Sequence, residues 1–575
     1  MQSVSVSYDD NAEFPKLIAT PILSQIESQI TRIFFHLNCP ENANEIQTIY
    51  LQIVNLLKQI KQGMQGENKE LYKEYLDTLY RMIGYTRDIR EGKGDRTGAY
   101  IMLMAFHEVY PVLSQYALYA FVYGGPGEEW QYGSWRDIGP LCELLRTYST
   151  QHEAHSLIDQ MIEYTNHQLM LDNNIWKYAN IRRDQKPLLL SNVSKWIPRE
   201  GKKYEWVFDR LYAHWARQHY SYILNTCESS DSHIRAQLKC KQLYRKTVAK
   251  LNRAIDTPEI KMCAKQWHNI EPMTVSMHAY IKHFRALTEP TPSADRQDDV
   301  VKKQIGVLKY RLFSSSANRP SNQDTISSAF LPIGYMVRRM IEINKKDVID
   351  KQIADERTYL NEQWQKMSDN IGRTAKILFM LPIVDVSITM WEKEESMVYS
   401  AVGMAILIAM RSGIQHRILA TDRCATWISW DANADFSTII KTVMSDIETM
   451  QKTRSDIQGT MDFITEMMVQ SRSTKRFMEN TTIIIFSDYR NNMLEQLVQG
   501  KYANISMVYW NMGHSITETA ATDINTYVSG NTVAVLKHVL RGMKPGSTDS
   551  PYQRIRSMVI HPRYDRLSTY LYGLQ

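Results

Sequence analysis

One polar segment follows an apolar run that is typical of a buried strand. Residues 375–384 are almost continuously apolar, and Asp385, Ser387 and Thr389 follow them at alternate positions. Such a run indicates a strand that is covered on both faces of its sheet. At the tip of a strand, alternate residues can turn their oxygen atoms toward one point. A carboxylate with two hydroxyls suits Mg²⁺, Mn²⁺ or Ca²⁺ better than zinc.

A second carboxylate follows a second apolar run. Residues 481–486 again have the composition of a buried strand, and Ser487 and Asp488 come directly after them. Open α/β sheets bind ligands at the carboxyl ends of their strands, so we expect Asp385 and Asp488 to contribute to one site. The alternative is that Asp385 caps a helix and that Asp488 only ends a strand.

The order of these segments resembles the von Willebrand A domain with its metal-ion-dependent adhesion site. In that family a strand leads into Asp-x-Ser-x-Ser, so Thr389 departs from the pattern but keeps the hydroxyl. Residues 459–463 resemble the middle loop of the family, which implies Thr460 as a further ligand. The resemblance implies a bound Mg²⁺, or Mn²⁺ or Ca²⁺, with these ligands: Asp385, Ser387, Thr389, Thr460 and Asp488.

The residues before this segment have the pattern of a helical scaffold. Apolar residues recur at helical spacing from Leu23 to Leu37 and in successive segments as far as Leu169, with short breaks between them. No alternating strand pattern interrupts these segments. The pattern predicts an all-α solenoid of paired, HEAT-like helices.

Positive charge is concentrated in one block of the chain. Residues 177–253 hold 17 Lys and Arg against 6 Asp and Glu, whereas the whole chain has a net charge of +6. Aromatic residues alternate with these cations: Trp176, Tyr178, Trp196, Tyr204, Trp206, Trp215 and Tyr220. Single-stranded RNA is bound by this mixture, through phosphate contacts and base stacking. The alternative is a solvated helical face with aromatic side chains packed behind it.

Two loops in the helical part combine cations with turn residues. Residues 86–96 contain Arg and Lys together with two glycines and are suited to cradling a phosphate at the start of the next helix. The alternative for this loop is a helix end followed by a charged cap. Residues 132–138 place Trp135 and Arg136 directly before another helix.

These loops resemble the helical region of TROVE-type proteins, the family of the Ro RNA-binding autoantigen. Further similar segments follow in order at 193–198, 244–246, 251–253, 259–262 and 267–270. Residues 508–512 and 528–531 are similar to strands of a TROVE-like family of plants, fungi and large DNA viruses, which joins this region to an A domain. The resemblance covers residues 80–543.

The resemblance and the basic block together predict an RNA-binding surface on the helical part. The predicted RNA contacts are Arg87, Arg90, Lys93, Arg96, Trp135, Arg136, Lys195, Trp196, Lys202, Lys203, Arg245 and Lys246. Because shared fold does not establish shared function, each of these residues has to be judged by its own surroundings.

The predicted architecture is multidomain, with the all-α solenoid followed by a doubly wound α/β domain of the von Willebrand A type. The predicted ranges are 1–45 for an N-terminal extension, 46–345 for the solenoid, 346–370 for a connecting helix, 371–543 for the A-like domain and 544–575 for a C-terminal tail. The tail is rich in Arg and Tyr, which suits docking on the body of the protein or binding to a partner.

Cysteine usage and hydropathy limit the cellular locations that are compatible with the sequence. Six cysteines without a close pair indicate reduced thiols, and the amino terminus lacks the basic region and apolar core of a signal peptide. The longest apolar run, near residues 401–410, is shorter than the roughly 20 residues that span a bilayer. We therefore expect no membrane span and a cytoplasmic, nuclear or virion location.

These observations favour a binding protein over an enzyme. The chain contains no Gly-x-Ser-x-Gly motif and no nucleotide-binding fingerprint, and no base or nucleophile is placed to use the metal. We expect RNA binding by the solenoid and docking of a partner protein whose carboxylate completes the metal coordination. The alternative is a structural or assembly protein without RNA binding, such as a virion component of a large DNA virus.

Overall fold

A computed structural model describes most of the chain. The described residues are 21–37, 42–88, 90–124, 131–182, 189–225, 230–270, 275, 279, 283, 332–346, 351–374, 379–393, 395–414, 416–451, 456–470, 481–488, 506–512, 527–529, 535–536, 540 and 550–573.

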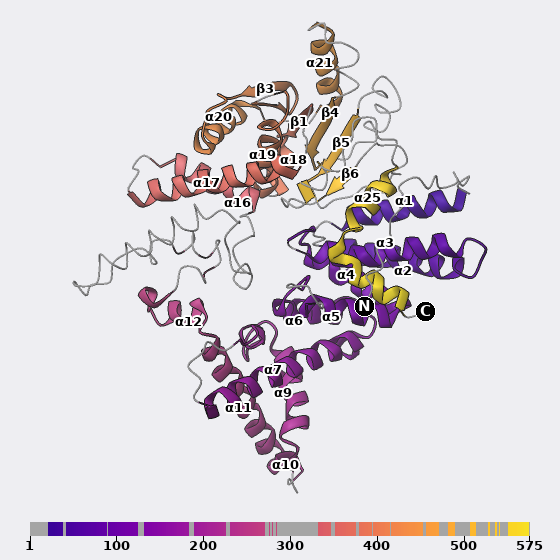
Figure 1. Ribbon diagram of the computed structural model, residues 1–575, viewed down its shortest axis with the longest axis vertical. Coiled ribbons are helices and arrows are strands. Elements are labelled where there is room, and N and C mark those ends of the chain that lie inside the picture. The colour runs from indigo at the N-terminus through magenta and orange to yellow at the C-terminus, as the bar shows by residue number, and fades with distance from the viewer. Residues whose placement is uncertain are drawn as a thin grey trace, which may run out of the picture.

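The amino-terminal part of the chain is a region of packed helices (Figure 1). Its elements are α1 (Pro21–His36), α2 (Ala43–Gly63), α3 (Lys69–Arg87), α4 (Arg96–Val109), α5 (Pro111–Val122), η1 (Trp135–Asp137), α6 (Ile138–Tyr148), η2 (His152–Ala154), α7 (Ser156–Arg182), α8 (Val193–Trp196), α9 (Glu205–His219), α10 (Ser221–Leu224), α11 (Ser230–Ile255), α12 (Pro258–Cys263) and η3 (Trp267–Asn269). Apolar spacing explains them: in α2, Ile49, Ile53, Leu56 and Ile60 are all buried on one face. The predicted helices between Leu23 and Leu169 are confirmed.

The carboxyl-terminal segment packs on the first helices of the chain. It consists of α25 (Pro551–Val559), η6 (Pro562–Tyr564) and α26 (Asp565–Gly573). α25 contacts α1 and α3, and α26 contacts α3 and α5 (Figure 1). Tyr570 stacks on Tyr116 with 3.7 Å between the ring centroids, and the Tyr132 hydroxyl donates to the Arg563 carbonyl at 2.8 Å. Residues 550–573 of the tail therefore complete the core of the helical region.

The second part of the structure is an α/β domain with a mixed sheet. Its strands are β1 (Met380–Asp385), β2 (Arg417–Thr421), β3 (Ala425–Ser429), β4 (Thr482–Ser487), β5 (Ser506–Asn511) and β6 (Tyr527–Ser529), in the spatial order β3-β2-β1-β4-β5-β6. All neighbouring strands are parallel except β2 and β3. β1 and β4 are buried along their whole length, as their apolar runs predict.

The helices of this domain pack on the sheet and on one another. They are α16 (Ile333–Asn344), α17 (Lys351–Thr374), α18 (Ile388–Lys393), α19 (Glu395–Ala409), α20 (Phe436–Thr449) and α21 (Ile457–Gln470). α19 packs on β1 and β2, whereas α20 and α21 contact β3. A helical region combined with an α/β domain is thus confirmed.

The predicted boundary at residue 345 does not match the packing. α16 lies inside the predicted solenoid range 46–345, but it packs on α19 and α20 of the α/β domain. Gly403 permits this close approach, because a Cβ atom at that position would lie 2.3 Å from Ile333 Cγ2. α1, in the predicted extension 1–45, packs instead on α2 and α25 within the helical region.

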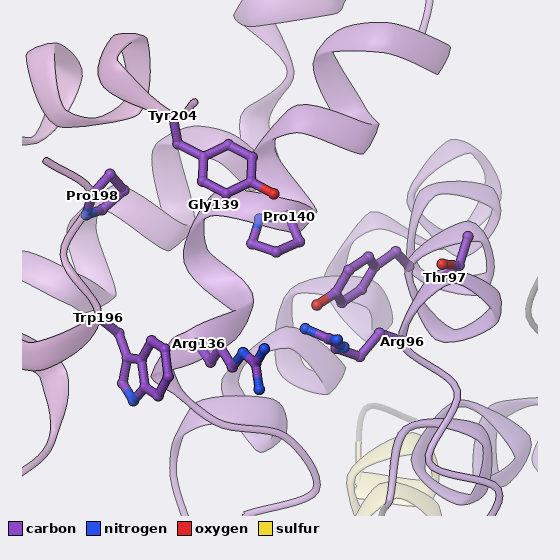
Figure 2. A pocket seen from close by; sticks show the side chains of 9 residues that line it. Arg96, Thr97, Arg136, Gly139, Pro140, Trp196, Pro198 and Tyr204 are labelled. Carbon is purple, nitrogen blue, oxygen red and sulfur yellow. The ribbon is translucent and has the colours of Figure 1, made fainter. Parts of the chain in front are cut away.

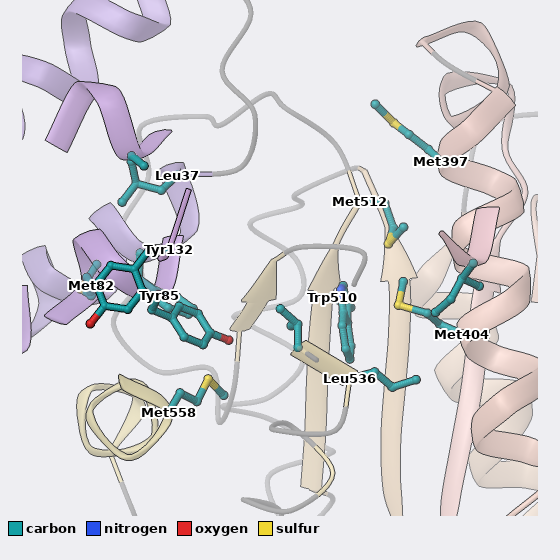
Figure 3. Packing of buried hydrophobic residues seen from close by; sticks show 14 of the residues in the cluster. Leu37, Met82, Tyr85, Tyr132, Met397, Met404, Trp510, Met512, Leu536 and Met558 are labelled. Atoms are coloured by element: carbon teal, nitrogen blue, oxygen red, sulfur yellow. The ribbon is translucent and has the colours of Figure 1, made fainter. Parts of the chain in front are cut away.

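Buried apolar side chains form one continuous cluster through both parts. In Figure 3, Leu37, Met82 and Met558 lie on the helical side, and Trp510 and Met404 lie on the α/β side. α1 also contacts β6 directly. The two parts therefore share a packed core.

Two expectations from composition can be compared with the part of the chain that the structure describes. Within it, no helix is both long and apolar enough to cross a bilayer. Cys142, Cys263 and Cys424 are free thiols.

Acid should destabilise the helical region through a buried histidine. His155 is 4% exposed, its ring centroid lies 4.7 Å from that of His107, and its Nδ1 accepts from the Leu157 N–H at 3.2 Å. Burial, and secondarily the neighbouring His107, lowers the pKa of His155 from 6.5 to about 4. Between about pH 6.5 and about pH 4, His155 is therefore protonated in the unfolded chain but neutral in the folded chain. Stability contributed by neutral His155 is full above about pH 6.5 and is lost toward pH 4, by up to about 2 kcal/mol.

The replacement His155→Asn isolates this effect, because Asn does not titrate but can still accept from the Leu157 N–H. Urea unfolding at about pH 7.5 and about pH 4.5 should show a smaller loss of stability in the variant than in the parent chain. The same loss in both proteins would contradict the assignment to His155.

Candidate metal centre and candidate nucleic-acid interface

The predicted carboxylates lie together where the strand order reverses. β1 is flanked by β2 and β4, and the chain passes from one side of the sheet to the other between these strands. Asp385 is the last residue of β1, and Asp488 directly follows β4. In open α/β sheets this position, outside the carboxyl ends of the strands, is where ligands bind.

Hydrogen bonds join four of the five predicted ligands. The Ser387 N–H donates to Asp385 Oδ1 at 2.9 Å, and Thr389 Oγ1 donates to Asp488 Oδ1 at 3.1 Å. Ser387 Oγ lies 3.1 Å from Thr389 Oγ1 and can donate to it, since Thr389 uses its own hydrogen on Asp488. The network thus runs from one carboxylate to the other through two hydroxyls.

The two carboxylates are buried close to one another. Asp385 is 0% exposed and Asp488 is 4% exposed. Burial raises the pKa of Asp385, hydrogen bonds from Ser487 and Ser387 lower it, and the charge of Asp488 raises it further. Both charges have been removed from water, and a cation between them would offset their repulsion.

Thr460 occupies a neighbouring position but belongs to a different network. It lies in the first turn of α21, where its Oγ1 donates to the Asp456 carbonyl at 2.8 Å and lies 2.6 Å from Thr421 Oγ1. Thr421 pairs with Asp385 in the register of β1 and β2. Among the described contacts, no hydrogen bond joins Thr460 to the other four predicted ligands.

The chemistry of the donor set fits a hard cation. The candidate ligands are two carboxylates and three hydroxyls, all oxygen donors, which suit Mg²⁺, Mn²⁺ or Ca²⁺. The residues that the structure describes contain no group of three or more His, Cys, Asp and Glu side chains arranged around a metal position.

Sequence reasoning missed two residues beside this site. Ser487 Oγ donates to Asp385 Oδ2 at 2.6 Å and so fixes the carboxylate that begins the network. The position of Ser487 in the sequence, directly before Asp488, could have indicated this role. Thr421 ends β2, a short strand that was not predicted because its apolar run covers only residues 418–420.

Three predicted RNA contacts are buried inside the helical region. Arg87 forms an ion pair with Asp137, in which its Nε and Nη2 donate to Asp137 Oδ2 at 3.0 Å and 2.7 Å. Lys93 Nζ donates to the carbonyls of Phe34 and Leu37, and Trp135 is 5% exposed. These three side chains pack inside the helical region and have little surface to offer RNA, which speaks against the prediction that they contact it.

Three other predicted contacts line one cavity (Figure 2). Arg96 begins α4, Arg136 lies in η1 and Trp196 ends α8. The cavity has a volume of about 480 Å³. Its other lining residues are Thr97, Tyr100, Gly139, Pro140, Pro198 and Tyr204. The structure thus brings together residues that are 100 positions apart in sequence.

Of the six remaining predicted contacts, two form ion pairs, one is half-buried and three are exposed. Lys195 Nζ lies 2.6 Å from Glu259, and Arg245 lies 2.7 Å from Glu200. The backbone N–H of half-buried Arg90 donates to Asp88 at 3.0 Å. The exposed cations are Lys202, Lys203 and Lys246.

Two comparisons of this chain with known proteins found no match. A comparison with models of protein families found no match, and a comparison with curated proteins found no similar sequence.

Proposed function

We propose that this chain is a two-part binding protein. The helical region would be a TROVE-like solenoid that binds RNA, and the α/β domain would be a von Willebrand A-like domain that docks a partner protein through a divalent cation. The location would be cytoplasmic or nuclear. The observation that carries the proposal is the hydrogen-bonded set of Asp385, Ser387, Thr389 and Asp488 at the reversal of the strand order.

The strand order supports the A-like assignment of the α/β domain. β1 and β4 are central and parallel, β3 is the antiparallel edge strand, and the acidic residues stand at the carboxyl ends of the central pair. Together with Thr460, the four joined residues would hold Mg²⁺ or Mn²⁺. Such a cation supplies a coordination position that accepts a carboxylate from a partner. The protein residues fix the oxygen donors and exclude bulk water from the buried carboxylates.

Docking through a metal predicts sensitivity to chelators. Partners captured from cell extract in Mg²⁺ should be lost in EDTA, and capture by an Asp385→Ala variant should not depend on Mg²⁺. Partner binding that is unchanged in this variant would contradict the docking role.

The cavity lined by Arg96, Arg136 and Trp196 supports RNA binding, because it combines cations with an aromatic ring. If three phosphates are contacted, affinity for single-stranded RNA should fall roughly twentyfold between about 50 mM and about 200 mM salt. An affinity that does not change with salt would contradict phosphate recognition.

A second function is favoured by the pairing of the basic block. Lys241 bridges Glu200 and Asp209, both at 2.9 Å, and Arg210 pairs with Asp159 at 2.6 Å. Cations already neutralised in this way have less charge to offer RNA, which favours a structural or assembly protein, such as a virion component. Absence of saturable RNA binding at low salt would support this alternative.

A further inference from the structure

The cavity in the helical region contains two arginines that face each other without a carboxylate between them. Figure 2 shows the guanidinium groups of Arg96 and Arg136 directed toward one another across the cavity. In the part of the chain that the structure describes, neither side chain has a hydrogen bond or an ion pair; the contact of Arg136 is with the ring of Trp196, 5.4 Å from the guanidinium carbon to the centroid. Two facing cations repel each other unless an anion lies between them.

The nearby acidic group does not neutralise this pair. Asp137 is adjacent to Arg136 in sequence, but it is 0% exposed and its oxygens accept from Arg87 and from the Tyr100 hydroxyl. The charges of Arg87 and Asp137 therefore neutralise each other. Asp95, next to Arg96 in the sequence, is 4% exposed and accepts from the Gly98 N–H at 3.1 Å. Among the described residues, no carboxylate forms an ion pair with either cavity arginine.

The walls of the cavity are apolar and aromatic. Trp196 and Tyr204 lie on one side, with Pro140 and Pro198 beside them (Figure 2). Gly139 allows this arrangement, since a Cβ atom there would lie 2.4 Å from the ring of Tyr204. The indole of Trp196 is only partly buried, and the cationic groups of Arg136 and Lys195 each lie 5.4 Å from its ring centroid. A planar base that stacks on this indole would take the place of one of these cations.

The volume and the charge of the cavity suit an organic phosphate monoester better than inorganic phosphate or a phosphodiester. A volume of about 480 Å³ is larger than an inorganic phosphate requires and lies in the range of small-molecule sites. Two guanidinium groups match a phosphate monoester, which carries a charge of about −1.5 to −2 at neutral pH, better than a phosphodiester with a single charge. The cavity thus combines a site for a dianion with a surface for an aromatic base.

We infer that this cavity binds a nucleotide that carries a phosphate monoester, with Arg96 and Arg136 on the phosphate and Trp196 under the base. The inference rests on the proposed RNA binding of the helical region and narrows it to a phosphorylated RNA end. A free nucleotide presents the same chemistry, so the experiment separates the two sources.

The test uses the full chain and one short single-stranded RNA in three forms, with a phosphate at the 5′ end, at the 3′ end or at neither. Binding is measured by fluorescence polarisation, and AMP, adenosine and inorganic phosphate are added as competitors. One phosphorylated form should bind about tenfold more tightly than the form without a terminal phosphate, and Arg136→Gln should remove this preference. AMP should compete better than adenosine or inorganic phosphate.

The matched control is Arg146→Gln. Arg146 also lies over a tryptophan, 4.9 Å from the ring centroid of Trp206, but it does not line the cavity. Both arginines are at least partly exposed, so neither replacement is expected to unfold the protein, which circular dichroism can check. The control variant should keep the preference for the phosphorylated end.

The outcomes separate this inference from the proposed function. Equal affinity for all three RNA forms, unchanged in Arg136→Gln, would overturn the nucleotide site and leave RNA binding in place. Binding of AMP that is weakened by Arg136→Gln, with no binding of any RNA, would support the nucleotide site and overturn the RNA-binding function. Failure to bind either AMP or RNA would overturn both.

Discussion

Replacement of Asp137 by Asn is expected to lower the free energy of unfolding by about 3–5 kcal/mol, because it leaves the buried Arg87 without its counter-charge. Asp137 accepts from Arg87, from the Tyr100 hydroxyl at 2.6 Å and from the Ser134 N–H at 3.0 Å. The exposed fractions of the Arg87 and Asp137 side chains are 5% and 0%, so water cannot replace the lost contacts. Urea unfolding followed by circular dichroism measures the change.

The control for this prediction is Glu153→Gln. It removes one partner of Arg146 at 3.5 Å, and the Glu153 side chain is 55% exposed. Such an exposed pair contributes less than about 1 kcal/mol, so the control should stay close to the parent protein. Equal effects of the two replacements would show that Arg87 and Asp137 are not held in a buried pair.

Replacement of Asp88 by Asn is expected to lower the free energy of unfolding by about 3 kcal/mol, because Arg563 then carries an unpaired charge in a largely buried position. Asp88 follows α3, whereas Arg563 lies in the carboxyl-terminal segment, and their side chains are 1% and 11% exposed. Asp88 also accepts from the Tyr564 hydroxyl at 3.2 Å. This contact joins the carboxyl-terminal segment to the helical region, so the carboxyl-terminal helices should also become more sensitive to proteolysis.

Arg556→Gln provides a control on the same segment. Arg556 pairs with Glu74 at 2.9 Å, but both side chains are more than one third exposed. We expect a change of less than about 1 kcal/mol and no increase in proteolysis. If Asp88→Asn behaved like this control, the carboxyl-terminal segment would not depend on the Asp88–Arg563 pair.

Local patterns were sufficient to predict most helices and the central strands. The apolar spacing of α2 and the continuous apolar runs of β1 and β4 depend on neighbours in sequence, and these elements formed as expected. The network from Asp385 to Asp488 was also predictable, because the carboxyl ends of parallel strands meet at one edge of a sheet.

The roles of individual cations could not be predicted in this way. The sequence around Arg87 or Lys93 does not show whether the cation faces RNA or a buried acceptor, because Asp137 is 50 residues from Arg87 and Phe34 is 59 residues from Lys93. The packing of Tyr570 on Tyr116 likewise depends on two segments that lie far apart in sequence. Sequence pointed to Arg96, Arg136 and Trp196 separately, and only the tertiary structure places them around one cavity.

Direct measurement of Mn²⁺ binding to the full chain tests the central claim, a divalent cation held at the reversal of the strand order. Electron paramagnetic resonance reports free Mn²⁺ in a titration of the parent protein, Asp385→Asn and Asp435→Asn. Asp435 is the control, since its carboxylate caps α20 by accepting from the Thr438 N–H at 2.9 Å. We expect a single saturable Mn²⁺ site in the parent protein and in Asp435→Asn, and the loss of this site in Asp385→Asn. Equal Mn²⁺ binding by Asp385→Asn, or no binding by the parent protein, would contradict it.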